Sequence, residues 1–176
     1  MRGKYVVLLV LLSGVVFGVA GMRYAFDPSP VYERFDQRRD ALPDDATGPR
    51  LLVEQINDFQ RTDFEPLAPD AGGVQRAHAV YKELGERPVE LSVRQVDPQR
   101  GLDELKAIQK DYEKNPNVSR LVFYPDAQTA YLYVVYAAEG RAVYEFAWIN
   151  HGWLLRAYTN QSDADTLLRF VNSYPN

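Results

Sequence analysis

Glu145 is the side chain in this sequence best placed to act as a general acid or base. It alternates with Val143, Ala147 and Ile149 in a segment of period two, so it shares an otherwise apolar strand face with them. A carboxylate on an apolar face tends to have a raised pKa, which suits acid–base catalysis. The alternatives are an ion pair with Arg156 on the neighbouring strand, or a place at the sheet edge.

The two histidines, His78 and His151, are the other candidates for chemistry. Neither belongs to a pair with metal-ligand spacing, so we expect no metal site. His78 lies on the apolar side of a predicted helix, which favours a packed core histidine, and His151 lies in a turn. The chain has no cysteine nucleophile, nucleophile elbow or glycine-rich phosphate loop. We therefore predict no enzyme and no cofactor; a small hydrolase or isomerase that uses Glu145 or His78 is the alternative.

Aromatic residues are concentrated in the last third of the chain. Strand alternation distributes them over both faces of the predicted sheet, although an antiparallel sheet needs only one apolar face. Tyrosine and tryptophan suit contact surfaces because they bury area and keep a polar tip. The candidate surface for a partner or ligand consists of Tyr131, Tyr133, Trp148 and Trp153. The alternative is that these side chains fill the core.

The elements that would position these residues follow from hydrophobic periodicity. Period-two segments with short turns between them predict a four-strand antiparallel meander over residues 120–124, 129–138, 141–149 and 153–159. Upstream, helical spacing predicts helices at 51–59, 74–84 and 102–112, with one strand at 89–93. A last helix starts near Ser162 and places Ala164, Leu167, Leu168 and Val171 against the sheet. The predicted fold class is α+β, with an antiparallel sheet of about five strands and helices packed on one face.

The N-terminus carries an uncharged run of 18 residues, from Tyr5 to Met22. As a helix it would span about 27 Å, close to the roughly 30 Å hydrocarbon core of a bilayer. We therefore expect residues 1–23 to form an N-terminal transmembrane helix, which is a signal sequence that stays uncleaved. The alternative is a cleaved signal peptide, for which Gly18 and Ala20 supply the small residues of a cleavage site.

Three glycines give the predicted anchor a helix-packing face. Gly14 and Gly18 form a GxxxG pair, and Gly21 lies one turn further on nearly the same face. Glycine lets helix backbones approach closely in a bilayer, so this face suits a homo-oligomer or a larger membrane complex. The alternative is that glycine is simply frequent in membrane helices.

Charge around the run predicts the topology of the chain. Arg2 and Lys4 favour a cytoplasmic N-terminus in a single-pass protein of the cell membrane. The bulk of the chain then lies outside, in the periplasm if the organism is a Gram-negative bacterium. Residues 24–50 contain four prolines and form a predicted stalk, and residues 51–176 form a single extracytoplasmic domain.

Composition limits the partners. Beyond Met22, 18 basic residues stand against 24 acidic ones, and no basic block appears, which argues against nucleic acid. An anchored domain without a catalytic constellation favours a non-enzymatic accessory or assembly subunit of a membrane complex. Such a subunit would bind a protein partner, or a second copy of itself, through its outer domain. The alternative is an envelope ligand-binding module for a glycan or an apolar small molecule.

Overall fold

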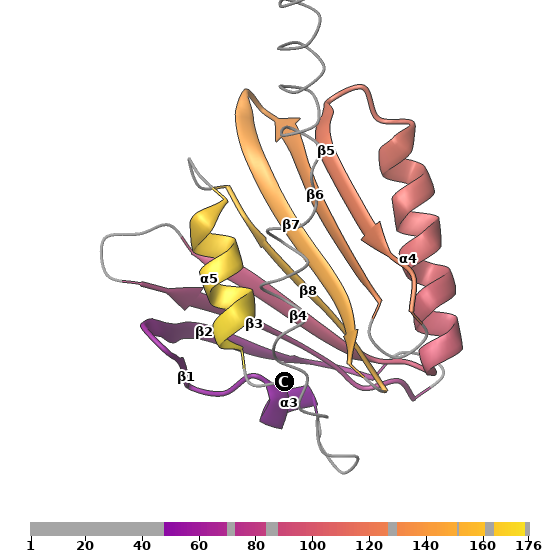
Figure 1. The fold of residues 1–176 in the computed structure, drawn as a ribbon. Helices are drawn as coiled ribbons and strands as arrows, with labels where there is room; N and C mark the ends of the chain where they lie inside the picture. The colour runs from indigo at the N-terminus through magenta and orange to yellow at the C-terminus, as the bar shows by residue number, and fades with distance from the viewer. Residues whose placement is uncertain are drawn as a thin grey trace, which may run out of the picture. The chain divides into compact units, whose positions relative to one another are not determined.

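An eight-stranded antiparallel sheet is the framework of the part of the chain that the structure describes (Figure 1). The structure is a computed structural model, and it describes residues 48–69, 73–83, 88–126, 130–150, 152–160 and 164–174. The strands are β1 (Gln55–Ile56), β2 (Phe59–Leu67), β3 (Arg76–Lys82), β4 (Val89–Gln95), β5 (Val118–Tyr124), β6 (Tyr131–Ala138), β7 (Arg141–Asn150) and β8 (Trp153–Thr159). The helices are α3 (Gly48–Leu51), α4 (Pro98–Glu113) and α5 (Asp165–Ser173).

Two meanders join edge to edge to form this sheet. Its strand order is β1-β2-β3-β4-β8-β7-β6-β5, so β4 pairs with the last strand rather than with the next one along the chain. The helix α4 carries the chain from β4 to the far edge at β5 (Figure 1). The pairing of β4 with β8 then places Leu91 opposite Ala157 and Ser92 opposite Arg156. Residues that are distant in sequence therefore meet near the middle of the sheet.

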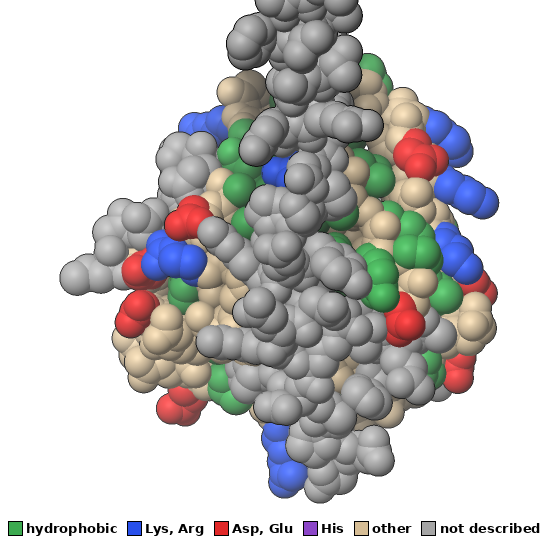
Figure 2. Space-filling view, viewed as in Figure 1, with side chains coloured by type: hydrophobic (Ala, Val, Ile, Leu, Met, Phe, Trp, Pro, Cys, Tyr) green, Lys and Arg blue, Asp and Glu red, His purple; other side chains and the backbone are tan. Residues whose placement is uncertain are grey.

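The helices α4 and α5 pack against opposite faces of the sheet. On β7, Ala147 belongs to the apolar cluster beneath α4, whereas the next residue, Trp148, contacts Tyr174 just after α5, with ring centroids 5.6 Å apart. Since successive strand residues point to opposite faces, the two helices cover different sides. Charged side chains gather along the outer side of α4 (Figure 2), and Leu102 and Leu105 of this helix are buried.

Local signals fix the start of α4. Asp97 is its N-cap and accepts hydrogen bonds from the backbone N–H groups of Gln99 and Arg100, at 3.1 and 3.2 Å. The first turn also approaches the sheet closely at Gly101, where an added Cβ would lie 3.1 Å from side-chain atoms of Ile149 and Val96. The predicted helix at 102–112 is confirmed, and its first turn fixes its distance from β7.

The predicted fold class is wrong in the first half of the domain. The structure has eight strands rather than about five, and the segments predicted as helices at 51–59 and 74–84 contain β1, the start of β2 and β3. In β3, Ala77, Ala79 and Tyr81 are all buried and follow period two. Ala77 and Tyr81 are also four residues apart, which is why this segment matched a helical pattern. The prediction that helices pack on one face is also wrong.

The transmembrane helix of the predicted fold class is not supported. Among the residues that the structure describes, no helix is both long enough and apolar enough to cross a membrane. The predicted span from Tyr5 to Met22, with Gly14, Gly18 and Gly21, lies outside those residues. The described residues therefore give no support to the single-pass transmembrane description of the chain.

Candidate functional site

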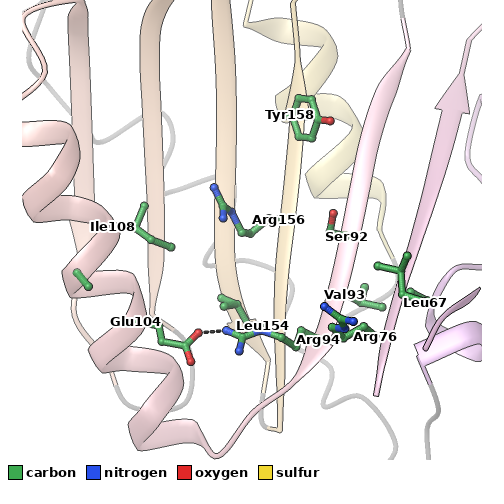
Figure 3. Close-up of a pocket in the computed structure, with 12 residues that line it drawn as sticks. Leu67, Arg76, Ser92, Val93, Arg94, Glu104, Ile108, Leu154, Arg156 and Tyr158 are labelled. Carbon is green, nitrogen blue, oxygen red and sulfur yellow. Dashed lines mark ion pairs between the residues drawn. The ribbon is translucent and has the colours of Figure 1, made fainter. Parts of the chain in front are cut away.

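A groove of about 530 Å³ lies between α4 and the part of the sheet formed by β2, β3, β4 and β8 (Figure 3). It forms because α4 packs against β5 to β8, so the same sheet face continues past the helix on the other strands. Its apolar lining comes from Leu67, Ala77, Val93, Ala107, Ile108 and Leu154. Its polar lining comes from Arg76, Ser92, Arg94, Glu104, Arg156 and Tyr158.

Strand register brings the arginines together. Arg76 of β3 lies directly opposite Arg94 of β4, and Ser92 of β4 lies directly opposite Arg156 of β8. Residues directly opposite each other on neighbouring strands point to the same face, so all four side chains rise toward the groove. From α4, Glu104 reaches across and forms an ion pair with Arg94, marked by the dashed line in Figure 3.

Glu145 is fully engaged in a buried polar network beside this groove. It is 4% exposed, and one carboxylate oxygen, Oε1, accepts from Arg156 Nε at 3.0 Å and Nη2 at 2.6 Å. The other oxygen, Oε2, accepts from the Tyr112 hydroxyl at 2.7 Å. The ion pair with Arg156, one of the alternatives open from the sequence, is confirmed. Glu145 therefore ties β7 to β8 and to α4.

The pKa values of the two partners of Glu145 reflect this network. Burial lowers the pKa of the Arg156 guanidinium, but the charge of Glu145 and its hydrogen bonds outweigh burial, so the pKa is raised. Burial, reinforced by the hydrogen bond to Glu145, raises the pKa of Tyr112. Arg156 therefore stays charged and Tyr112 stays a neutral donor over the physiological pH range.

His78 lies on the same sheet face, on β3, and not in a closed core. Its Nε2 is 3.3 Å from a carboxylate oxygen of Glu90, and its side chain is 24% exposed. The Tyr158 hydroxyl also donates to Glu90. The strands β4 and β8 separate His78 from Glu145 on β7, so the structure does not bring the two candidate catalytic residues together. The prediction of a packed core histidine on a helix is wrong, and His151 lies outside the described residues.

The four aromatic residues of the predicted surface lie in the interior. Tyr131, Tyr133 and Trp148 are each 1% exposed, and Trp153 is 4% exposed. Tyr131 stacks on Phe146 at 5.4 Å, and Tyr133 lies 6.1 Å from the same ring. These side chains do not form an open binding surface, and the alternative of an aromatic core describes them better.

The arginines of the groove were not among the residues predicted from the sequence to form a site. Arg94 lies just beyond the strand predicted at 89–93, and Arg76 lies in a segment predicted to be helical. One signal in the sequence could have indicated these residues. The segments that form β4 and β8 both alternate with period two, and Ser92, Arg94 and Arg156 occupy their polar positions. Among the residues described by the structure, no cluster of three potential metal ligands exists.

Comparison with known proteins identifies no family for this chain. No protein-family model and no curated protein sequence matches it. Among solved structures, it resembles a GTP-binding regulator from Thermotoga maritima, with 17% sequence identity and a TM-score of 0.49 over 78% of this chain and 94% of that one. A likeness at this level carries no inference about function.

Alkaline pH is expected to unfold the domain through its buried tyrosines. Burial raises the pKa of Tyr133 to about 12 and raises those of Tyr81 and Tyr174 as well. In the unfolded chain these groups ionise near pH 10. Because the folded-state values are higher, their stabilising effect is complete below about pH 10 and is lost above it, by about 1.4 kcal/mol per pH unit for each tyrosine.

Denaturant titrations between about pH 8 and about pH 11 measure this loss. Tyr174→Phe serves as the matched variant, because it should lower the slope by the contribution of one tyrosine. A free energy of unfolding that stays constant above pH 10 would contradict the expectation.

Proposed function

We propose that this domain is a non-enzymatic binding module that holds a small, largely apolar molecule in the groove beside α4. The observation that carries the proposal is the groove itself. Its volume of about 530 Å³ falls within the range of roughly 300–1,000 Å³ that is usual for small-molecule sites. An apolar floor with a few converging polar groups is also the usual composition of such sites.

The acidic and histidine side chains support binding rather than catalysis. Both carboxylate oxygens of Glu145 accept hydrogen bonds within the protein, and His78 faces the carboxylate of Glu90. A general acid or base must reach a substrate proton directly or through one water. Glu145 is instead used to hold Arg156 and Tyr112 in place.

An apolar molecule suits the groove better than a glycan does. The hydroxyl groups of a glycan need many hydrogen-bond partners, and unsatisfied polar groups are costly once they leave water. The floor of the groove offers Leu67, Ile108 and Leu154 instead. Binding of a protein partner through this domain stays a prediction. The four aromatic residues proposed as its contact surface are buried, so they do not support it.

Filling the groove is expected to abolish binding. Ala107 lines the groove from an exposed position of α4, so Ala107→Trp occupies the space without disturbing the helix core. We expect the full chain to bind the neutral fluorescent probe N-phenylnaphthylamine, and Ala107→Trp to weaken this binding by at least about tenfold, the loss of about 1.4 kcal/mol. Fluorescence titration measures it.

Glu113→Trp is the control, because Glu113 is an exposed residue of the same helix that does not line the groove. Both variants add a tryptophan to α4, and only one of them fills the site. Equal affinities of the two variants for the probe, or no binding by the unaltered chain, would refute the proposed function.

A further inference from the structure

Two positive charges lie side by side on the wall of the groove. Arg76 and Arg94 occupy directly opposite positions on β3 and β4, and both line the groove. Like charges at such positions destabilise a sheet unless an opposite charge lies nearby. A negatively charged group close to Arg76 and Arg94 would therefore be stabilised by both guanidinium groups.

Of the two arginines, only Arg94 has an ion-pair partner among the described residues. Glu104 forms an ion pair with Arg94, but the same carboxylate is also 3.5 Å from Nε of Arg100. Arg76 donates to a backbone carbonyl, that of Ala68, at 2.9 and 3.3 Å. Among the described residues, no carboxylate lies within ion-pair distance of Arg76.

Among the described residues, the charged side chains that line the groove and the carboxylates in the ion pairs described above sum to one positive charge. Three guanidinium groups line it, those of Arg76, Arg94 and Arg156. They face two carboxylates, Glu104 on the wall and Glu145 beneath Arg156. The whole chain carries a net charge of −4, so this positive surplus is local to the groove. Local charge of this kind selects ligands of opposite sign.

We propose that the molecule held in the groove is an amphiphile with a single anionic head group, a carboxylate. Its head lies at Arg76 and Arg94, and its apolar part lies over Leu154 and Ile108. Guanidinium groups pair with carboxylates through charge-assisted, often bidentate hydrogen bonds. Figure 3 shows the arrangement, with Arg76 and Arg94 on β3 and β4 and with Leu154 and Ile108 nearer to α4. This inference rests on the proposed function and names the ligand class of the same site.

The glutamate from α4 competes with the ligand in this arrangement. Because Glu104 occupies Arg94, an incoming carboxylate must share that guanidinium or displace Glu104. Removing the negative charge of Glu104 should therefore strengthen carboxylate binding, whereas removing Arg76 should weaken it. A role of these residues in folding alone would give the two substitutions the same sign.

Displacement of N-phenylnaphthylamine from the full chain tests whether the site prefers an anionic head group. Dodecanoate, dodecanol and dodecyl phosphate share one apolar chain and differ in charge. We expect dodecanoate to displace the probe about tenfold more effectively than dodecanol. Arg76→Gln should abolish this preference, Glu104→Gln should increase it, and Arg141→Gln, at an exposed position of the β6–β7 hairpin, should leave it unchanged.

The outcomes separate this inference from the proposed function. Equal displacement by dodecanoate and dodecanol, from a site that Ala107→Trp still blocks, overturns the anionic head group and leaves the binding module intact. A clear preference for dodecyl phosphate over dodecanoate overturns the assignment of a single charge. Probe binding that Ala107→Trp does not change overturns the proposed function and this inference together.

Discussion

Phe170→Ala is expected to destabilise the domain by about 4 kcal/mol, because it empties a fully buried site between α5 and the sheet. The Phe170 ring is 0% exposed. It meets the ring of Phe59 edge-on at 5.2 Å and that of Tyr81 at 5.1 Å. Loss of this ring removes the contacts that hold α5 on β2 and β3, and urea unfolding followed by circular dichroism measures the cost.

Leu168→Ala is the matched control for this prediction. Leu168 lies on the same helix, was predicted from the sequence to face the sheet, and is only half-buried. We expect its replacement to cost about 1 kcal/mol, since less apolar area is lost from the core. A cost for Leu168→Ala as large as that for Phe170→Ala would contradict the observed orientation of α5.

Arg156→Met is expected to cost about 3 kcal/mol at neutral pH, because it leaves the carboxylate of Glu145 buried without its cation. The side chain of Glu145 is 5% exposed, whereas that of Arg156 is 44% exposed, which places the cost at the lower end of the range for buried pairs. Urea unfolding at about pH 7 measures the loss.

The double variant Glu145→Leu with Arg156→Met separates a charge effect from a packing effect. Replacing both members of a buried ion pair by apolar residues is often nearly neutral, so most of the lost stability should return. If the double variant is no more stable than Arg156→Met, the ion pair does not account for the loss.

Local sequence signals were enough to predict the second half of the fold. Glu139 and Gly140 form a two-residue turn, both with positive φ, 51° and 74°. Such turns join adjacent antiparallel strands, and the flanking segments also alternate with period two. The helix α4 was predictable for the same reason, because Asp97, Pro98 and its apolar stripe all indicate one helix.

The first half could not be predicted because its patterns fit two structures. Thr62, Asp63 and Glu65 read as a capping box, yet they lie in β2, where the register with β3 shifts between Arg61 and Asp63. Pro66 is also unusual within a strand, but β2 is covered on its outer side only by the two-residue β1. Proline is tolerated near such an edge.

The site was missed for a topological reason. Its arginines lie on β3, β4 and β8, and Arg156 joins the other two because β4 pairs with β8 across more than fifty residues of chain. No local pattern indicates which distant strands become neighbours. The pair of Glu145 with Arg156 was predictable because β7 and β8 are joined by a short turn.

Amide NMR spectra of the isotope-labelled full chain, recorded during titration with dodecanoate, test the central claim most directly. If the groove is the binding site, the largest shift changes occur on β3, β4, β8 and the groove side of α4, around Arg76, Arg94, Ile108 and Leu154. In Ala107→Trp these changes should disappear. Shift changes confined to α5 and its sheet face, or none at saturating dodecanoate, would contradict the assignment of the groove as a ligand site.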